Sequence, residues 1–161
     1  MIFFAFVFIV ILAYTFLYIS LRLFLPWFFE VKRQKFGVET LVSLAVILSF
    51  VFFTLVVANI VIGGELGNRI QHAFAGGFAA YMTYFFALKD SKIKLPFLKI
   101  AVFGFFLVTT LGVLNELAEF SAQHFLGLTF ATTIEDTWLD LASNTFGILI
   151  SIFSTRVREY I

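Results

Sequence analysis

The chain has 161 residues, of which 61% are hydrophobic and 13% are charged, and its formal net charge is +1. Soluble domains carry about 25% charged residues, so this composition excludes a soluble globular protein and indicates that lipid surrounds much of the chain. The near balance of charge leaves no basic face, which excludes nucleic acid as a partner. The sequence has no Cys, which excludes disulfides, thiolate catalysis and Cys-ligated zinc.

The first apolar run covers residues 2–29 and is interrupted only by Arg22. It is too long for the hydrophobic part of a signal peptide and has no small-residue cleavage site after it. We therefore expect a retained transmembrane helix. Arg22 lies about one turn inside its end, and we expect its long side chain to extend outward to the membrane interface.

The second predicted helix, residues 40–62, contains no charged side chain and ends at Gly63 and Gly64. The third, residues 70–88, begins with many small residues, which let neighbouring backbones approach closely. We expect this helix to be the packed centre of the bundle. Its small residues are Ala73, Ala75, Gly76, Gly77, Ala79 and Ala80.

Two more helices follow. Pro96 marks the start of the fourth, residues 97–125. The neutral linker 126–134 resembles a re-entrant or interfacial segment, and the fifth helix covers residues 137–154. The sequence therefore predicts an all-α, single-domain integral membrane bundle of five transmembrane helices in residues 1–161.

The basic residues are distributed unevenly, and this bias predicts the orientation in the membrane. With five helices, ten of the eleven Lys and Arg residues fall on one side and only Arg69 falls on the other. The ten are Arg22, Lys32, Arg33, Lys35, Lys89, Lys92, Lys94, Lys99, Arg156 and Arg158. We expect their side to be cytoplasmic, with the N-terminus outside, the C-terminus in the cytoplasm and the chain in the inner or plasma membrane as a multi-pass protein.

Residues 114–147 hold five of the ten carboxylates and no Lys or Arg. Carboxylates beside apolar segments are costly to bury unless they meet water, a cation or a shared proton. In the five-helix arrangement the start of the third helix, the end of the fourth and the start of the fifth meet on the outer face. Ionisable groups from three helices therefore converge there.

The spacing of these groups suggests a site. Oxygen-rich ligands favour Mg²⁺, Mn²⁺ or Ca²⁺, and an imidazole adds Zn²⁺ or iron. A carboxylate pair without metal can do acid–base chemistry. The metal-ligand candidates are His72, Glu116, Glu119, Asp136 and Asp140. The catalytic candidates are His72, Glu119 and Asp140, and the substrate-binding candidates are Arg69, Gln123 and Asn144.

Structural alternatives exist for several of these residues. Asp136 is placed to cap the fifth helix, because carboxylates favour helix N-termini. Asn144 could be a hydrogen-bonding clamp between helices. His72 could pair with a carboxylate only to hold helices together.

Two motifs carry a family resemblance. The segment N-E-L-A-E-F-x-x-Q-x-x-x-G, followed by E-D-T-W-x-D-L-x-x-N-x-x-G, resembles the closing motif of the VanZ-like superfamily, and most closely its YjdF-like inner-membrane proteins. The segment N-R-I-Q-H-A-F-A-G-G-F resembles their earlier motif, with Asn68 where the family often has Asp. The resemblance covers about 80 residues. The motif positions are Arg69, His72, Glu116, Glu119, Asp136, Asp140 and Asn144.

The resemblance implies a small multi-span protein linked to envelope or lipid-linked substrates. Two functions therefore stay open. In the first, a site near the outer membrane face, with a divalent cation as its candidate cofactor, acts on a lipid or envelope headgroup. In the second, the chain is a non-enzymatic accessory subunit or small transporter, and the same residues form a proton relay or packing clamp. Membrane lipids are the expected partners, and other membrane subunits are candidate partners.

Overall fold

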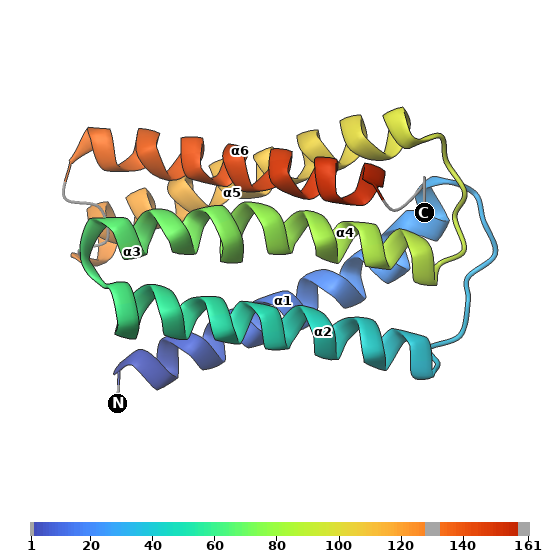
Figure 1. Cartoon of the computed structure of the whole chain (residues 1–161), viewed down its shortest axis with the longest axis horizontal. Coiled ribbons are helices and arrows are strands. Elements are labelled where there is room, and N and C mark those ends of the chain that lie inside the picture. The colour runs from blue at the N-terminus through green and yellow to red at the C-terminus, as the bar shows by residue number, and fades with distance from the viewer. Residues whose placement is uncertain (1, 128–132, 158–161) are drawn as a thin grey trace.

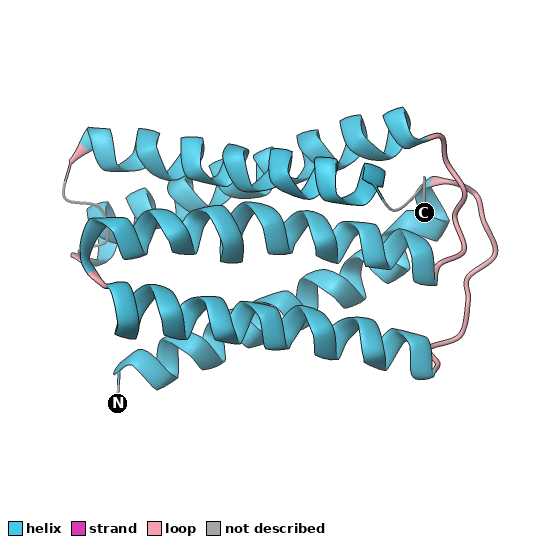
Figure 2. Cartoon of the chain, in the orientation of Figure 1, coloured by secondary structure: helices cyan, strands magenta, loops and turns pink. Residues whose placement is uncertain are grey.

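The computed structural model describes residues 2–127 and 133–157, and every regular element in these residues is helical (Figures 1 and 2). The elements are α1 (Ile2–Phe28), α2 (Val38–Val56) with its π-helical continuation (Val57–Ile62), α3 (Gly64–Ile70), a second π-helical segment (Gln71–Phe78), α4 (Ala79–Asp90), α5 (Phe97–Leu126) and α6 (Ile134–Val157). Because the π-helical segments join their neighbours without a break, these elements form five rods. The predicted all-α fold is confirmed.

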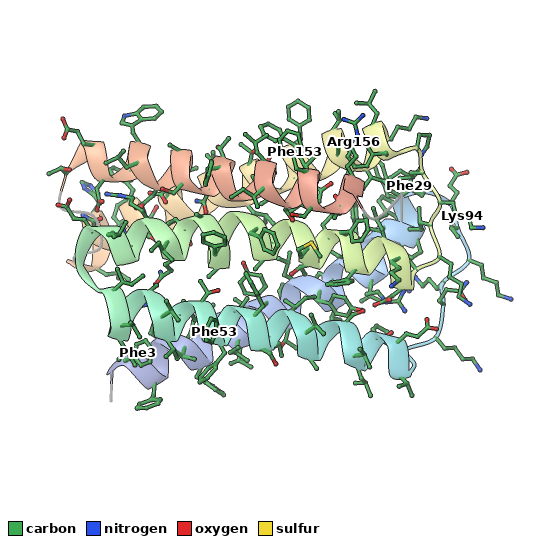
Figure 3. The ribbon with its side chains drawn as sticks, in the orientation of Figure 1. Phe3, Phe29, Phe53, Lys94, Phe153 and Arg156 are labelled. Carbon is green, nitrogen blue, oxygen red and sulfur yellow. The ribbon has the colours of Figure 1, made fainter. Side chains whose placement is uncertain are left out.

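Three of the rods are long and apolar enough to cross a membrane, among the residues that the structure describes. They cover Phe3–Phe28, Val38–Ile62 and Phe97–Leu126. Large apolar side chains project from the outside of the bundle, as Phe53 and Phe153 do in Figure 3. An apolar outer surface of this extent is typical of a protein whose solvent is lipid.

The third rod, from α3 to α4, is the centre of the bundle, as predicted. Its α4 part contacts α1, α2, α5 and α6, and its π-helical part lies against α6. Tyr81, Tyr84 and Leu88 of α4 are almost completely buried. The remaining helices therefore surround this rod.

Small residues bring α6 close to the π-helical segment. A Cβ added to Gly147 would overlap the carbonyl oxygen of Ala73, and one added to Gly77 would overlap the carbonyl oxygen of Asn144. Only glycine permits two backbones to lie this close. This contact fixes the position of α6 along the axis of the third rod. It therefore determines which polar residues of the two lie opposite each other.

The third rod begins at Gly64, six residues before the predicted start at residue 70. Gly63 and Gly64 both have positive φ, which reverses the chain within two residues and lets a new helix begin at once. Gly67 then packs against the backbone of Ala58. Arg69 is consequently helical, and His72 lies eight residues, or about 12 Å, beyond the start of the rod.

Arg22 refines another prediction. Its side chain reaches toward the α1–α2 loop, where Nη1 donates to the Ser91 hydroxyl at 2.8 Å and Nη2 lies 3.4 Å from the Thr40 hydroxyl. It is nevertheless buried, with 3% of the residue exposed, and does not reach solvent. Residues of the first turn of α2 and directly after α4 therefore enclose a cation that the sequence alone places at the interface.

The five rods separate the charges between the two ends of the bundle. The N-terminus, the start of α3, the end of α5 and the start of α6 lie at one end, and the α1–α2 and α4–α5 loops lie at the other (Figure 1). The first, here called the acidic end, carries Glu65, Glu116, Glu119, Glu135, Asp136 and Asp140 with Arg69. The second, the basic end, carries Arg22, Lys32, Arg33, Lys35, Lys89, Lys92, Lys94, Lys99 and Arg156 with Glu30, Glu39 and Asp90.

Candidate functional site

Three helices place one possible ligand each in a single small volume near the acidic end. A nitrogen of His72 and one carboxylate oxygen each of Glu116 and Asp140 lie within 4.8 Å of one another. His72 comes from the π-helical segment, Glu116 from α5 and Asp140 from α6. We call these three residues the triad.

The triad lies deeper along the helices than the sequence suggests. Glu116 is ten residues before the end of α5, and Asp140 is six residues after the start of α6. At 1.5 Å per residue these separations are about 15 Å and 9 Å. Glu116 is 8% exposed and Asp140 3% exposed. The predicted meeting of three helices is present, but inside the bundle.

Arg69 pairs with both aspartates of α6. Its guanidinium forms ion pairs with Asp136 and Asp140, and Nη1 also donates to the backbone oxygen of Asp136 at 3.2 Å. Burial disfavours the cation, but the hydrogen bonds and negative charges of both aspartates favour it. Arg69 therefore stays positively charged and fixes α6 to α3.

Asp140 is the most connected member of the triad. Its Oδ1 accepts hydrogen bonds from Arg69 and, at 3.1 Å, from Nδ2 of Asn68. The same oxygen lies 3.5 Å from Nε2 of His72. The other ring nitrogen of His72, Nδ1, lies 3.4 Å from Nδ2 of Asn144. Both nitrogens of the imidazole thus face groups on α6.

Glu116 differs from the aspartates because its charge has no direct compensation. Its Oε1 is buried and has no hydrogen-bond partner among the described residues. A buried carboxylate oxygen without a donor is costly, since the lost hydration is not replaced. Glu116 therefore requires either a proton or a cation in the space that it shares with His72 and Asp140.

The remaining site candidates lie around the triad. Glu119 is half-buried, accepts a 2.7 Å hydrogen bond from Asn115 on its own helix, and is not among the three close ligands. Gln123 is half-buried and lies seven residues beyond Glu116, toward the end of α5. The catalytic role expected for Glu119 and the substrate-binding role expected for Gln123 stay predictions.

The predicted cap at Asp136 is wrong. The helix begins at Ile134, and the backbone N–H of Asp136 lies 3.2 Å from the hydroxyl of Thr133. Thr133 thus caps the helix, and the Asp136 side chain is available to Arg69. Asn144, in contrast, contacts His72 and packs against Gly76, which agrees with its expected role as a clamp between helices.

Sequence reasoning missed two supporting residues. In the sequence, Asn68 is distinguished only by its departure from the family motif. Its position four residues before His72 nevertheless puts both side chains on one helical face. Tyr14 of α1 donates a hydrogen bond to the backbone oxygen of Ala75 in the π-helical segment. A single Tyr in an apolar helix gives no sequence signal for this contact, which satisfies a carbonyl group three residues after His72.

The donor set of the triad suits a divalent cation. One imidazole and two carboxylates are ligands that Zn²⁺, Mn²⁺ or iron accept, whereas Ca²⁺ needs more oxygens than these residues supply. Asp140 also accepts hydrogen bonds from Arg69 and Asn68, and carboxylate ligands of metals are commonly held by such bonds. The residues therefore fit a cation with three protein ligands and an open coordination position.

Comparisons of the chain with protein families, with curated proteins and with solved structures find no match.

Proposed function

We propose that this chain is a multi-pass membrane protein whose triad binds a divalent cation and acts on a lipid or envelope headgroup. In this proposal all five rods cross the inner or plasma membrane, with the acidic end outside and the basic end in the cytoplasm. The concentration of basic residues at one end of the bundle supports this orientation. The motif resemblance to VanZ-like and YjdF-like proteins supports an envelope or lipid-linked substrate.

The observation that carries the proposal is the buried Oε1 of Glu116, which lacks a partner next to His72 and Asp140. Arg69 offsets one of the two aspartate charges, so these residues together with an ionised Glu116 carry a surplus of negative charge. A divalent cation would supply the missing positive charge and, when bound, would polarise a phosphoryl or carbonyl oxygen of the headgroup. His72 and Asp140 would hold the cation, and Asn144 would hold the imidazole.

Thermal unfolding of the purified protein in detergent, with and without Mg²⁺, Mn²⁺, Ca²⁺ and Zn²⁺, tests cation binding. A cation at 100 times its dissociation constant stabilises the native state by about 2.7 kcal/mol. We expect this stabilisation for the wild type with Zn²⁺ or Mn²⁺ and its loss in Glu116→Gln and His72→Ala. Glu119→Gln should reduce it less, because Glu119 contributes charge from outside the triad.

Matched controls lie at the same end of the bundle. Glu65→Gln removes an exposed carboxylate of α3, and His124→Ala removes an exposed imidazole that stacks on Phe120 and meets Phe125 edge to face. Both controls should keep the cation effect. Equal behaviour of the wild type and Glu116→Gln with every cation would refute the metal site.

A second function is favoured by the pairing of Arg69 with both aspartates. A cluster whose aspartates are already held by Arg69 could serve as a packing clamp in an accessory subunit, or as a proton relay in a small transporter, through Glu116 and His72. In that case Glu116→Gln would be neutral or stabilising without any cation, because a neutral amide is less costly to bury than a carboxylate.

A further inference from the structure

A pocket of about 490 Å³ lies at the basic end, at the opposite end of the bundle from the triad. It is formed by the α1–α2 loop, the first turn of α2 and the end of α4. Its lining residues are Gln34, Lys35, Gly37, Val38, Glu39, Thr40, Asp90 and Lys92. This volume is within the range of small-molecule sites. We call it the α2 pocket.

A buried cation supports the wall of the α2 pocket. Arg22 contacts two lining residues, since Nη2 lies 3.4 Å from the Thr40 hydroxyl and 3.5 Å from the backbone oxygen of Lys35. Its Nε is buried without a hydrogen-bond partner, and no carboxylate lies within ion-pair distance of it among the described residues. Buried guanidinium groups are normally paired with anions.

The α2 pocket also has a buried anion. Asp90 is 6% exposed and lines the pocket, and its Oδ2 accepts a hydrogen bond from the Tyr18 hydroxyl. The exposed Glu39 lines the same pocket. Two carboxylates beside the ammonium groups of Lys35 and Lys92 make the lining suited to a ligand that carries both signs of charge.

The start of α2 favours the anionic part of such a ligand. Its N-cap residue, Gly37, provides no side-chain cap, so the N–H groups of the first turn stay available. Helix N-termini with free N–H groups bind phosphate well. Lys35, Lys92 and these N–H groups would contact a phosphate, and Asp90 and Glu39 would contact an ammonium group.

We propose that the α2 pocket binds a phosphoethanolamine group. The ligand is zwitterionic and small enough for the pocket, and its charges match the two ammonium and two carboxylate groups of the lining. The surrounding basic side chains at this end of the bundle would also attract phosphate. The group can come from the headgroup of a membrane phospholipid or from a soluble molecule. This site is independent of the triad and of its cation.

Native mass spectrometry and thermal unfolding of the full chain in detergent test this proposal. The probes are phosphatidylethanolamine, phosphatidylcholine and phosphatidylglycerol, together with soluble phosphoethanolamine. We expect phosphatidylethanolamine to bind about tenfold more tightly than the other two lipids, because only its headgroup has cationic N–H groups that can form charge-assisted hydrogen bonds with Asp90. Stabilisation by soluble phosphoethanolamine as well would identify the group itself as the ligand, and stabilisation by the lipid alone would identify the lipid.

Variants locate the effect in the pocket. Asp90→Asn keeps an acceptor for Tyr18 and should remove the preference for phosphatidylethanolamine, and the exposed Glu39→Gln should weaken it if Asp90→Asn does not fold. Lys35→Gln should weaken binding of every phosphate-bearing probe, whereas Lys99→Gln, outside the pocket, should not. Equal or tighter binding of phosphatidylglycerol, binding unchanged by the pocket variants, or no binding of any probe would overturn the proposal.

Discussion

The amide nitrogen Nδ2 of Asn144 lies 3.4 Å from Nδ1 of His72, on the side of the imidazole away from Asp140. With Asn144 donating, Nδ1 accepts, and Nε2 carries the proton toward Oδ1 of Asp140 at 3.5 Å. One residue of α6 thus sets the tautomer of His72, and another residue one turn earlier faces the Nε2–H group. Binding of a cation by Nε2 would displace that proton.

Cation binding should therefore release protons and weaken as the pH falls. Protonation of Glu116 or His72 removes a ligand, so the dissociation constant should rise as the pH falls. Titration calorimetry in two buffers with different ionisation enthalpies would measure the protons released. Glu116→Gln, which cannot be protonated, should abolish the pH dependence together with binding. An affinity that does not change with pH in the wild type would contradict ligation by these groups.

Replacing Arg69 should destabilise the protein strongly. Arg69→Met leaves Asp136 and Asp140 without their cation, and breaking a buried ion pair costs about 3–5 kcal/mol. Thermal or denaturant unfolding in detergent should show this loss. The triple variant with Asp136→Asn and Asp140→Asn should recover most of it, because no uncompensated carboxylate is left on α6. Arg156→Gln, at the other end of the bundle, is the control and should have little effect.

The contact between α6 and the π-helical segment should not tolerate a methyl group. Gly147→Ala and Gly77→Ala would each push two backbones apart, and overpacking of this kind costs about 1–3 kcal/mol. Gly112→Ala is the matched control, because its Cβ would lie 3.5 Å from Nδ2 of Asn144, an ordinary contact. This change should be neutral or stabilising, since alanine favours the helix. Equal unfolding temperatures for Gly147→Ala and Gly112→Ala would show that the close packing is not essential.

Reporter fusions would determine the orientation in the membrane. Fusions at Lys35, Asp90 and Ile161 should all report the cytoplasm, because the positive ends of transmembrane helices are retained there. A fusion between Gly63 and Gly64 should report the outside. An external signal from any of the first three positions would contradict the proposed five-span topology.

Helix number was predictable because composition and charge placement are local properties of the sequence. The end of the second helix was predicted correctly at Ile62, since two consecutive glycines mark it. The start of the third helix was not, because polar residues such as Glu65 and Asn68 suggest a loop. They are helical because the positive φ of Gly63 and Gly64 begins a new helix at once.

The sequence predicted which helix ends meet, and so placed His72 and Asp140 close together, but it did not determine which other residues face them. Whether Glu116 or Glu119 lies beside them depends on the rotation of α5 about its axis, and the apolar side chains on every face of that helix do not determine it. The burial of Arg22 was not predicted because its partners, Ser91 and Thr40, belong to other parts of the chain.

The separation of acidic and basic residues between the two ends also makes the chain an electric dipole along its long axis. In the proposed orientation the carboxylates lie on the positive side of a resting membrane and the ammonium and guanidinium groups on the negative side. Moving one elementary charge through a potential of 100 mV changes the free energy by about 2.3 kcal/mol. The potential therefore stabilises this orientation over the inverted one, and it draws cations away from the outer carboxylates toward the cytoplasm.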